Sequence, residues 1–403
     1  MKETSLQRRK FLGLVSKAGL LSVCRFPLSR NTGEPAEDEH VFLTQPYLQN
    51  PCFDAMTIKW ITNKPCYGWV EYGLDENLGQ KAERIELGLV EANNRIHTIQ
   101  LSNLKPGTTY HYKVLSKDFV KYDPYKIIYG KTIESKVYSF TTPAEHADSV
   151  SLLVLNDIHD RPASIPFLMN MNGNDPYDFV FFNGDMFNYQ SDEQQIIDHM
   201  LTPCTDVFAS VKPFMYIRGN HETRGKFARH LNDYFENIDQ ANYFSFTRGP
   251  VHFITLDTGE DKPDDTPVYA GMCAFDDYRR QQAAWLEKQL QSREYRKAPF
   301  RVVFMHIPPY HSGDWHGTMH CRELFAPLFN KHKVDLVICG HTHRWGVYEP
   351  DPAQHHFPII IGGGPQEGKR TLIKLRADRH QLNLSMLADN GKEVGKYHLQ
   401  AKR

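Results

Sequence analysis

The sequence predicts two domains, an all-β sandwich followed by an α/β/β/α layered domain. Strand-like segments separated by turn residues fill residues 41–143 at the spacing of a β-sandwich. From residue 149 onward, apolar strands alternate with longer polar or helical stretches, as in layered α/β domains. A chain of 403 residues with 40% hydrophobic content accommodates both cores. We therefore expect a leader and linker at 1–40 and domains at 41–143 and 149–403.

The first residues carry a pattern that we interpret as an export leader. Arg8 and Arg9 are followed by Phe11 and Leu12, and then by a modestly apolar stretch over 14–24 that is too short to span a bilayer. This pattern resembles a bacterial twin-arginine signal, although the usual small-residue cleavage pattern is missing. The alternatives are a basic N-terminal helix, a transit peptide, or a lipoprotein modified at the cysteine that ends the stretch. The resemblance implies export to the periplasm or cell surface.

The 41–143 region combines alternating strands with a turn that precedes aromatic residues. Apolar and polar residues alternate over 55–61 and 68–72. Tyr110 and Tyr112 follow a Pro-Gly turn, as a tyrosine corner requires, and Trp60 is suited to fill the core. These features resemble a fibronectin type III domain, and in particular the N-terminal domain of purple acid phosphatases. We expect the three aromatic side chains to be core residues rather than ligand-binding ones.

Five predicted strands of the second domain end in polar residues that are able to bind a metal ion. The strands cover 150–155, 179–183, 214–218, 302–305 and 334–339. The residues that follow them are Asp157 and His159, Asp185, Asn220 to Glu222, His306, and His341 and His343. Each fragment alone is common in turns and helix caps. Five such fragments in succession, each at the end of a predicted strand, have a small probability of occurring by chance. The strand ends of such a sheet converge on one rim.

This ordered set is similar to the calcineurin-like metallophosphoesterases over about residues 151–347, with a glycine-rich strand end at 361–364 continuing the likeness. The resemblance implies a centre of two metal ions bridged by Asp185. One ion would be held by Asp157, His159, Asp185 and His343, and the other by Asp185, Asn220, His306 and His341.

The ligand types agree with the chemistry that the resemblance implies. Hydrolysis of a phosphate ester by in-line attack uses two cations roughly 3.5 to 4 Å apart, and a bridging carboxylate holds them at that separation. Asp, His and Asn side chains suit Fe, Zn or Mn, and none of the seven cysteines occupies a position in the motifs. We expect two divalent or mixed-valence transition metal ions and hydrolysis by metal-activated hydroxide, with phosphomonoesters favoured.

The resemblance also implies roles for residues that do not bind the metal ions. His221 follows the metal-binding asparagine and is expected to be the general acid at the leaving oxygen. Glu222 is expected to orient a ligand. Arg224 could bind a phosphate through its guanidinium, or remain an exposed loop arginine. His316 lies ten residues beyond His306, where purple acid phosphatases carry a substrate-facing histidine.

Two positions depart from the relatives. Purple acid phosphatases carry a ferric-iron ligand, the tyrosine that gives them their colour, three residues after the bridging aspartate; here that residue is Asn188, with Tyr189 one further on. They also lack a histidine corresponding to His159. We therefore expect a colourless enzyme. Ser/Thr protein phosphatases have an aspartate at the Asn188 position, so the side chain that orients His221 in them is absent.

The overall charge gives no support to a polyanionic partner. The formal net charge is only −1, so we expect no nucleic acid as a partner. The family resemblance implies a small phosphorylated substrate, and the oligomeric state stays open. No run is long and apolar enough for a transmembrane helix. A phosphodiesterase or nuclease of the same superfamily remains an alternative, as does a binding sandwich fused to a degenerate phosphatase domain.

Residues 372–400 contain a hairpin turn at 389–391 and are expected to add terminal strands to the catalytic sheet.

Overall fold

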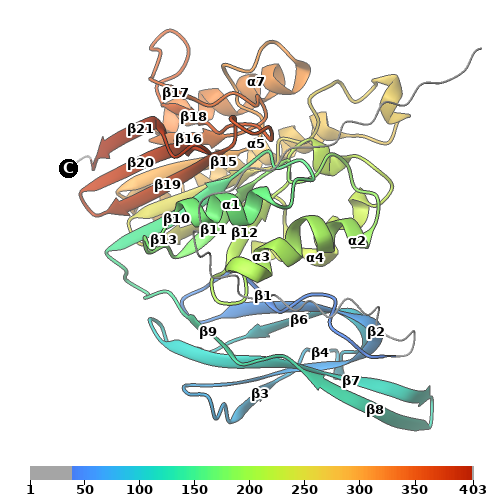
Figure 1. The fold of residues 1–403 in the computed structure, drawn as a ribbon. Coiled ribbons are helices and arrows are strands. Elements are labelled where there is room, and N and C mark those ends of the chain that lie inside the picture. The colour runs from blue at the N-terminus through green and yellow to red at the C-terminus, as the bar shows by residue number, and fades with distance from the viewer. Residues whose placement is uncertain (1–38, 402–403) are drawn as a thin grey trace, which may run out of the picture. The chain divides into compact units, whose positions relative to one another are not determined.

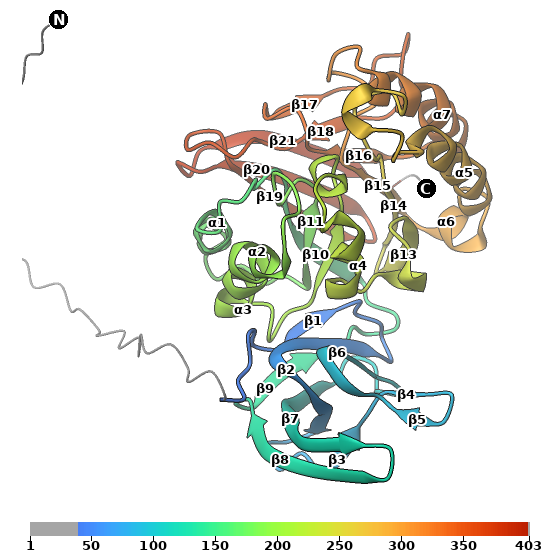
Figure 2. The same cartoon turned by 90° about the vertical axis from the view of Figure 1, so that its right-hand side faces the viewer.

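The computed structural model describes residues 39–401 (Figures 1 and 2). The expected export leader, with most of the linker, lies outside the described residues. Within the described part of the chain, no helix is long and apolar enough to cross a membrane.

The N-terminal region is built from strands only. They are β1 (Tyr47–Gln49), β2 (Met56–Gly73), β3 (Gln80–Ala82), β4 (Ile85–Glu86), β5 (Leu89–Val90), β6 (Ala92–Leu101), β7 (Thr109–Asp123), β8 (Lys126–Glu134) and β9 (Tyr138–Thr141). The first half of β2 pairs with β1 and β6 and its second half pairs with β7 and β3, with a register shift between Ile61 and Cys66. Such irregularities bend a strand, which allows the two halves of β2 to pair with different sets of neighbours in the N-terminal region.

The three predicted aromatic core residues lie in the interior of this region. Trp60 and Tyr112 are fully buried and Tyr110 is 4% exposed, so the prediction is confirmed. The indole of Trp60 donates a hydrogen bond to Ser116, and the backbone N–H of Lys105 donates to the Tyr110 hydroxyl. The Tyr110 contact fixes the turn before β7, as a tyrosine corner does.

His97 on β6 is a buried imidazole whose neutral form is favoured. Its ring stacks on Trp60 with centroids 4.8 Å apart, and its Nε2 lies 3.3 Å from the Thr62 hydroxyl and 3.2 Å from the Cys66 thiol. Burial lowers the pKa of His97 to about 3. The folded state therefore stays neutral at this position while the unfolded chain takes up a proton below about pH 6.5.

We expect the free energy of unfolding to fall as the pH drops from about 6.5 toward 3, by at most about 1.4 kcal/mol per pH unit from His97 alone. The measurement is urea denaturation of the wild type and of a His97→Asn variant at several pH values. The wild type should show the steeper loss because only its unfolded state gains this proton. Equal slopes for the two proteins would contradict the assignment.

The second region contains two further sets of strands. The first comprises β10 (Ser149–Leu155), β11 (Phe179–Asn183), β12 (Phe214–Ile217), β19 (Thr371–Asp378), β20 (Gln381–Ala388) and β21 (Glu393–Gln400). The other comprises β13 (Phe244–Arg248), β14 (Val251–Leu256), β15 (Phe300–Met305), β16 (Leu336–Cys339), β17 (Gly346–Tyr348) and β18 (Ile359–Ile361). The longer helices and helical turns are α1 (Ser164–Met171), α2 (Glu193–Ile196), η1 (Ile197–Leu201), α3 (Thr202–Val207), α4 (Leu231–Tyr234), α5 (Phe275–Gln289), α6 (Arg293–Lys297) and α7 (His316–His332). The short 3₁₀ turns are η2 (His221–Thr223), η3 (Ala228–His230), η4 (Ile238–Gln240) and η5 (Pro267–Tyr269).

Alternation along the strands places these elements in four layers. Leu153 and Leu155 of β10 join a core with residues of α1, η1 and α3, whereas Leu152 and Val154 face a core shared with β14, β15 and β16. A third core lies between those strands and helices α5 and α7. In Figure 1, α1–α4 lie beside β10–β12, and α5 and α7 lie beside β15 and β16. The predicted α/β/β/α arrangement is confirmed.

Parallel pairing directs the carboxyl ends of the central strands to the same side of each sheet. β10, β11 and β12 are parallel neighbours, and so are β14, β15, β16 and β18. The terminal strands β19, β20 and β21 extend the first sheet in antiparallel fashion beside β10. The hairpin predicted at 389–391 joins β20 to β21. The prediction that the C-terminal residues add strands to the catalytic sheet is therefore confirmed.

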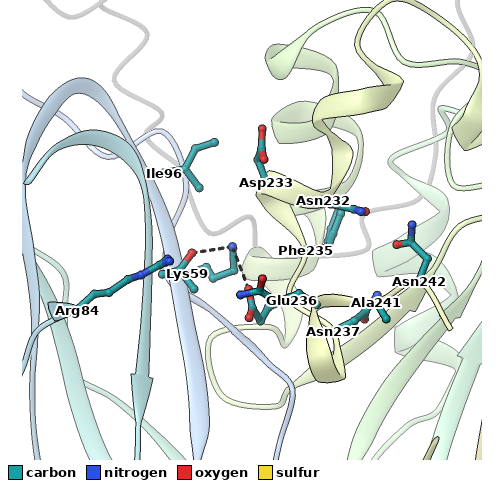
Figure 3. A pocket seen from close by; sticks show the side chains of 12 residues that line it. Lys59, Arg84, Ile96, Asn232, Asp233, Phe235, Glu236, Asn237, Ala241 and Asn242 are labelled. Atoms are coloured by element: carbon teal, nitrogen blue, oxygen red, sulfur yellow. Dashed lines mark hydrogen bonds and ion pairs between the residues drawn. The ribbon is translucent and has the colours of Figure 1, made fainter. Parts of the chain in front are cut away.

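The two regions share hydrogen-bonded sheet structure. β1 pairs in parallel with β12, and the hydroxyls of Tyr47 and Tyr112 donate to backbone carbonyls of Tyr234 and Ser210. A cavity of about 440 Å³ lies beside this junction and is drawn in Figure 3. It is lined by Lys59, Arg84, Ile96, Thr98, Asn232, Asp233, Phe235, Glu236, Asn237, Gln240, Ala241 and Asn242. None of these belongs to the predicted ligand set, so this cavity is separate from the strand ends that carry the candidate ligands.

Candidate metal centre

Two groups of ligand atoms meet at the strand ends. The first group contains Asp157, His159, Asp185 and His343, and the second contains Asp185, His306 and His341. Within each group the candidate ligand atoms all lie within 4.8 Å of one another, and Asp185 belongs to both groups. These are the six carboxylate and imidazole ligands expected from the sequence. The seventh, Asn220, lies beside them, with its Oδ1 2.9 Å from His341 Nδ1.

The separations between donor atoms match those around a bound cation. His159 Nε2 lies 3.6 Å from Asp157 Oδ1, 3.5 Å from Asp185 Oδ2 and 3.0 Å from His343 Nε2. His343 Nε2 is 3.3 Å from Asp157 Oδ1, and His306 Nε2 is 3.0 Å from Asp185 Oδ2. Metal–donor bonds of about 2.0–2.2 Å place neighbouring donors about 3 Å apart. The side chains are therefore spaced for metal binding.

Unpartnered polar atoms at the centre show that the residues fit a metal ion. Asp157 Oδ1 and His306 Nε2 are both buried and lie 3.3 and 3.0 Å from oppositely charged or chargeable neighbours, yet neither makes a hydrogen bond within residues 39–401. Buried polar atoms are rarely left unpaired because their desolvation is costly. His306 Nδ1 meets the carbonyl of Asn183 at 2.8 Å, which leaves Nε2 directed toward Asp185. A cation shared with the carboxylates would satisfy both unpartnered atoms.

The electrostatics of the centre also favour cations. Burial opposes ionisation of Asp157 and Asp185, yet the neighbouring imidazoles, His306 above all, hold both pKa values below their usual range. Burial likewise works against protonation of His306, but the two carboxylates raise its pKa to about 10. Two carboxylates therefore remain charged in a buried setting, where they attract a positive charge strongly.

Five of the ligands occupy an unusual backbone conformation. The φ angles are 52° at Asp157, 49° at His159, 55° at Asp185, 73° at His341 and 55° at His343. Residues other than glycine adopt this left-handed backbone region at a cost of order 1–3 kcal/mol each, and such residues cluster at functional sites. Aspartate and histidine adopt this region more readily than most residues, but still at a cost, so the surrounding contacts help to hold these turns.

Glycines allow the loops at the centre to approach closely. A Cβ atom at Gly219 would lie 2.3 Å from Asp185 Oδ1, and one at Gly184 would lie 2.5 Å from His306 Nδ1. Gly184 additionally has φ +84°. The residue before Asp185 and the residue before Asn220 therefore have no room for a side chain, and glycine at both positions lets the two loops pack against each other.

Glu222 joins the loops that follow β11 and β12. Its fully buried carboxylate accepts hydrogen bonds from the backbone N–H groups of Asp185 (2.8 Å), Met186 (2.6 Å), Phe187 (3.1 Å) and Gly219 (2.6 Å). Burial and the Asp185 carboxylate raise the pKa of Glu222 to about 7, against the effect of these donors. Both carboxylate oxygens of Glu222 are thus engaged by backbone donors of the two loops.

His221 is held by backbone and by an arginine. Its Nδ1 lies 2.8 Å from the carbonyl oxygen of Asn188, and its Nε2 lies 3.1 Å from Arg224 Nη1. The sequence provides no acidic side chain to orient this imidazole, and the structure provides a main-chain carbonyl instead. A carbonyl contact of this kind is not encoded by the residue type, so sequence patterns do not reveal it.

Glu260 is a site residue that the sequence reasoning missed. It is 1% exposed and binds Arg224 bidentately, with Nε–Oε1 and Nη2–Oε2 distances of 2.8 and 2.9 Å. It also accepts hydrogen bonds from Thr223 and Tyr269. Glu260 follows β14, a sixth buried strand that ends on the same side as its parallel neighbour β15, and this position is the signal that could have identified it.

His316 lies in neither ligand group. Its Nε2 is 2.7 Å from Asp276 Oδ1, at the start of α5. Near the centre, the Asn188 side chain meets His159 Nδ1 at 3.2 Å, while Tyr189 is 57% exposed.

Comparison with known proteins defines the class. Residues 150–345 match the calcineurin-like phosphoesterase family, and residues 44–142 match the purple acid phosphatase N-terminal domain. The chain therefore consists of a calcineurin-like phosphoesterase domain joined to a purple acid phosphatase N-terminal domain. More particularly, it is a purple acid phosphatase-like dinuclear metallophosphoesterase, a hydrolase of phosphoric esters.

The relatives that support this conclusion are plant enzymes. Probable purple acid phosphatase 20 of Arabidopsis thaliana is 25% identical over 386 residues, which cover 88% of this chain and 81% of the relative. Purple acid phosphatase 21 of the same plant is also 25% identical, covering 73% of this chain and 63% of the relative.

Two solved structures share the fold. A purple acid phosphatase from yellow lupin (Lupinus luteus) seeds has a TM-score of 0.66 and 19% identity, covering 88% of this chain and 74% of that one. PhoD has a TM-score of 0.63 and 13% identity, covering 92% of both chains.

Proposed function

We propose that the protein hydrolyses small phosphomonoesters at the candidate metal centre. The observation that carries the proposal is the position of Asp185, whose carboxylate belongs to both ligand groups and can hold two cations together. We propose Fe, Zn or Mn as the ions because the ligands are oxygen and imidazole nitrogen. When bound, the two ions supply an activated hydroxide and neutralise the phosphoryl oxygens.

The chain's own residues position the ester and manage the leaving group. The centre is reachable by substrate, because the His343 side chain is 35% exposed. We propose that His221 donates a proton to the leaving oxygen, and that Arg224, held by Glu260, binds a phosphoryl oxygen beside it. We propose no side chain as the nucleophile, so no covalent bond forms between the protein and the phosphoryl group.

Paired substrates test the reaction class. Metal-reconstituted protein is assayed with an aryl phosphomonoester and with a bis-aryl phosphodiester that has the same leaving group. We expect a higher kcat/KM for the monoester. A preference for the diester would support the phosphodiesterase alternative, and turnover of neither would contradict the proposal.

Replacing His221 by alanine should reduce kcat by about 10²–10³-fold, because general acid catalysis contributes on this order. The loss should be larger for an alkyl phosphate, whose leaving group needs a proton, than for a nitrophenyl phosphate. Metal content should stay unchanged. His230→Ala is the matched control, since His230 is an exposed histidine beside Asp233. An equal loss with both substrates would argue against proton donation.

We expect the metal-loaded protein to lack an intense visible charge-transfer band. Asn188 occupies the position of the tyrosine ligand expected in purple acid phosphatases, and its amide contacts the backbone carbonyl of His159 and the Asp160 carboxylate instead. Tyr189 is 57% exposed. The measurement is the absorption spectrum of protein reconstituted with iron, and a strong visible band would contradict the assignment.

We further propose that the protein is exported to the periplasm or cell surface. The paired Arg8 and Arg9 before a short apolar stretch support this proposal. Fractionation of cells that express the full chain would locate the protein.

A further inference from the structure

A second cluster of metal-binding side chains lies outside the candidate centre. Asp276, His316 and His320 each offer one ligand atom, and these atoms lie within 4.8 Å of one another. We propose that this cluster is a third metal site, for a divalent transition ion of the zinc type.

Two helices bring the three residues together. His316 is the first residue of α7 and His320 lies one turn further, so both imidazoles project from the same face of the helix. Asp276 is in the first turn of α5, next to that face. Two histidines at this spacing, completed by a carboxylate from another element, are a recurrent arrangement for binding zinc.

The atomic separations resemble those at the candidate dinuclear centre. Asp276 Oδ1 lies 2.7 Å from His316 Nε2 and 3.2 Å from His320 Nδ1, compared with 3.0–3.6 Å among donors at the dinuclear centre. The two imidazole rings are 5.6 Å apart between centroids. Small adjustments would place all three donors at the bond lengths of a zinc ion.

The buried ring nitrogen of His320 faces the carboxylate of the cluster. His320 is 8% exposed, and its buried Nδ1 makes no hydrogen bond among residues 39–401, although Asp276 Oδ1 lies 3.2 Å away. A simple pair between His316 and Asp276 would not satisfy this nitrogen, whereas a shared metal ion would.

The surrounding charge selects the kind of ion. Arg279 Nη1 lies 3.0 Å from Asp276 Oδ1, while other nitrogens of this guanidinium bind the carbonyls of Thr258 and Glu260. The carboxylate is thus partly neutralised, which disfavours Ca²⁺ or Mg²⁺ because these ions depend on charged oxygen ligands. Two imidazoles favour Zn²⁺, Ni²⁺ or Cu²⁺ instead.

The proposed site adjoins the loop that holds Arg224. The N–H of Gly317, next to His316, donates to the carbonyl of Asp261 at 2.9 Å, and Asp261 follows the buried Glu260 that binds Arg224. An ion at the cluster would fix the start of α7 against this loop. His316 would then be a metal ligand, in place of the phosphate contact that the family resemblance implies.

Metal stoichiometry tests the proposal on the full chain. Metal-depleted wild type, Asp276→Asn and His316→Gln proteins are dialysed against micromolar free Zn²⁺, and bound zinc is measured by mass spectrometry. We expect each variant to bind one equivalent less than the wild type. His230→Gln, at an exposed His–Asp pair without a third ligand, should bind as much as the wild type.

Equal zinc content in the wild type and both variants would overturn the proposal. Because His316 is 32% exposed at its side chain, its replacement should leave the fold intact, and Co²⁺ absorption of the wild type gives a second measurement. The Co²⁺ spectrum of the wild type minus that of His316→Gln should contain the d–d bands of a four- or five-coordinate ion. The absence of these bands would also contradict the third site. The difference of one equivalent is expected whether or not the dinuclear centre fills, so failure of the two proposals can be told apart.

Discussion

Replacing Asp185 by asparagine should lower kcat/KM by at least about 10³-fold, because metal-assisted hydrolysis requires both cations. The carboxylate oxygens of Asp185 face different partners: Oδ1 accepts a hydrogen bond from the backbone N–H of His221 at 2.9 Å, and Oδ2 lies 3.0 Å from His306 Nε2. Asparagine retains the shape but offers only one acceptor oxygen and no charge. It therefore cannot bridge two cations.

The measurements are steady-state kinetics with an aryl phosphomonoester and metal content by mass spectrometry. We expect the variant to lose at least one of the two ions while its circular dichroism spectrum stays unchanged. Asp192→Asn is a suitable control, since Asp192 caps α2 and belongs to neither ligand group, and asparagine caps a helix equally well. A variant with wild-type activity would refute the hydrolytic role of this centre.

Replacing Glu222 by alanine should destabilise the protein by about 3–5 kcal/mol, a cost typical of breaking a buried charged network. Four backbone N–H groups donate to this carboxylate, and alanine leaves all of them without an acceptor. Urea denaturation of metal-depleted protein separates this effect from the loss of bound metal ions. Glu222→Gln should give an intermediate loss because one acceptor oxygen remains.

Glu287→Ala provides the control for removal of a glutamate. Glu287 is on the surface of α5, where it pairs with Lys331, and its loss should change stability little. If Glu222→Ala unfolded at the same urea concentration as the wild type, the four hydrogen bonds would not carry the stability that we assign to them. Activity should fall as well, because the loops at Asp185 and Gly219 lose their common anchor.

The residues that we propose as metal ligands could be grouped from the sequence because their positions follow a rule that depends on local pattern. Apolar strands such as 150–155 and 179–183 can be identified from composition, and parallel strands place their carboxyl ends on one side. The residues just beyond those ends are therefore neighbours in space, whatever their separation along the chain. Asp157 and His343, far apart in sequence, meet at 3.3 Å for this reason.

Contacts that depend on helix packing or on main-chain atoms were not predictable in this way. Asp276 meets His316 only because α5 lies beside α7, and no local pattern specifies that register. His221 is oriented by the backbone carbonyl of Asn188, which every residue type possesses. The left-handed φ angles of the proposed ligands are uncommon for any residue other than glycine, even though aspartate and histidine tolerate them, so the sequence around each residue did not specify them.

The pairing of β1 with β12 makes the N-terminal region a cap for the catalytic sheet. β12 has β11 as its other neighbour and pairs with β1 at one position, Gln49 opposite Phe214; without β1 this position would lose its partner, and the Tyr47 ring would leave the core that it shares with Phe214. An open strand edge of this kind recruits strands from other chains. We therefore expect a phosphoesterase domain produced without residues 41–143 to self-associate more readily than the full chain, although the missing region contributes none of the proposed metal ligands.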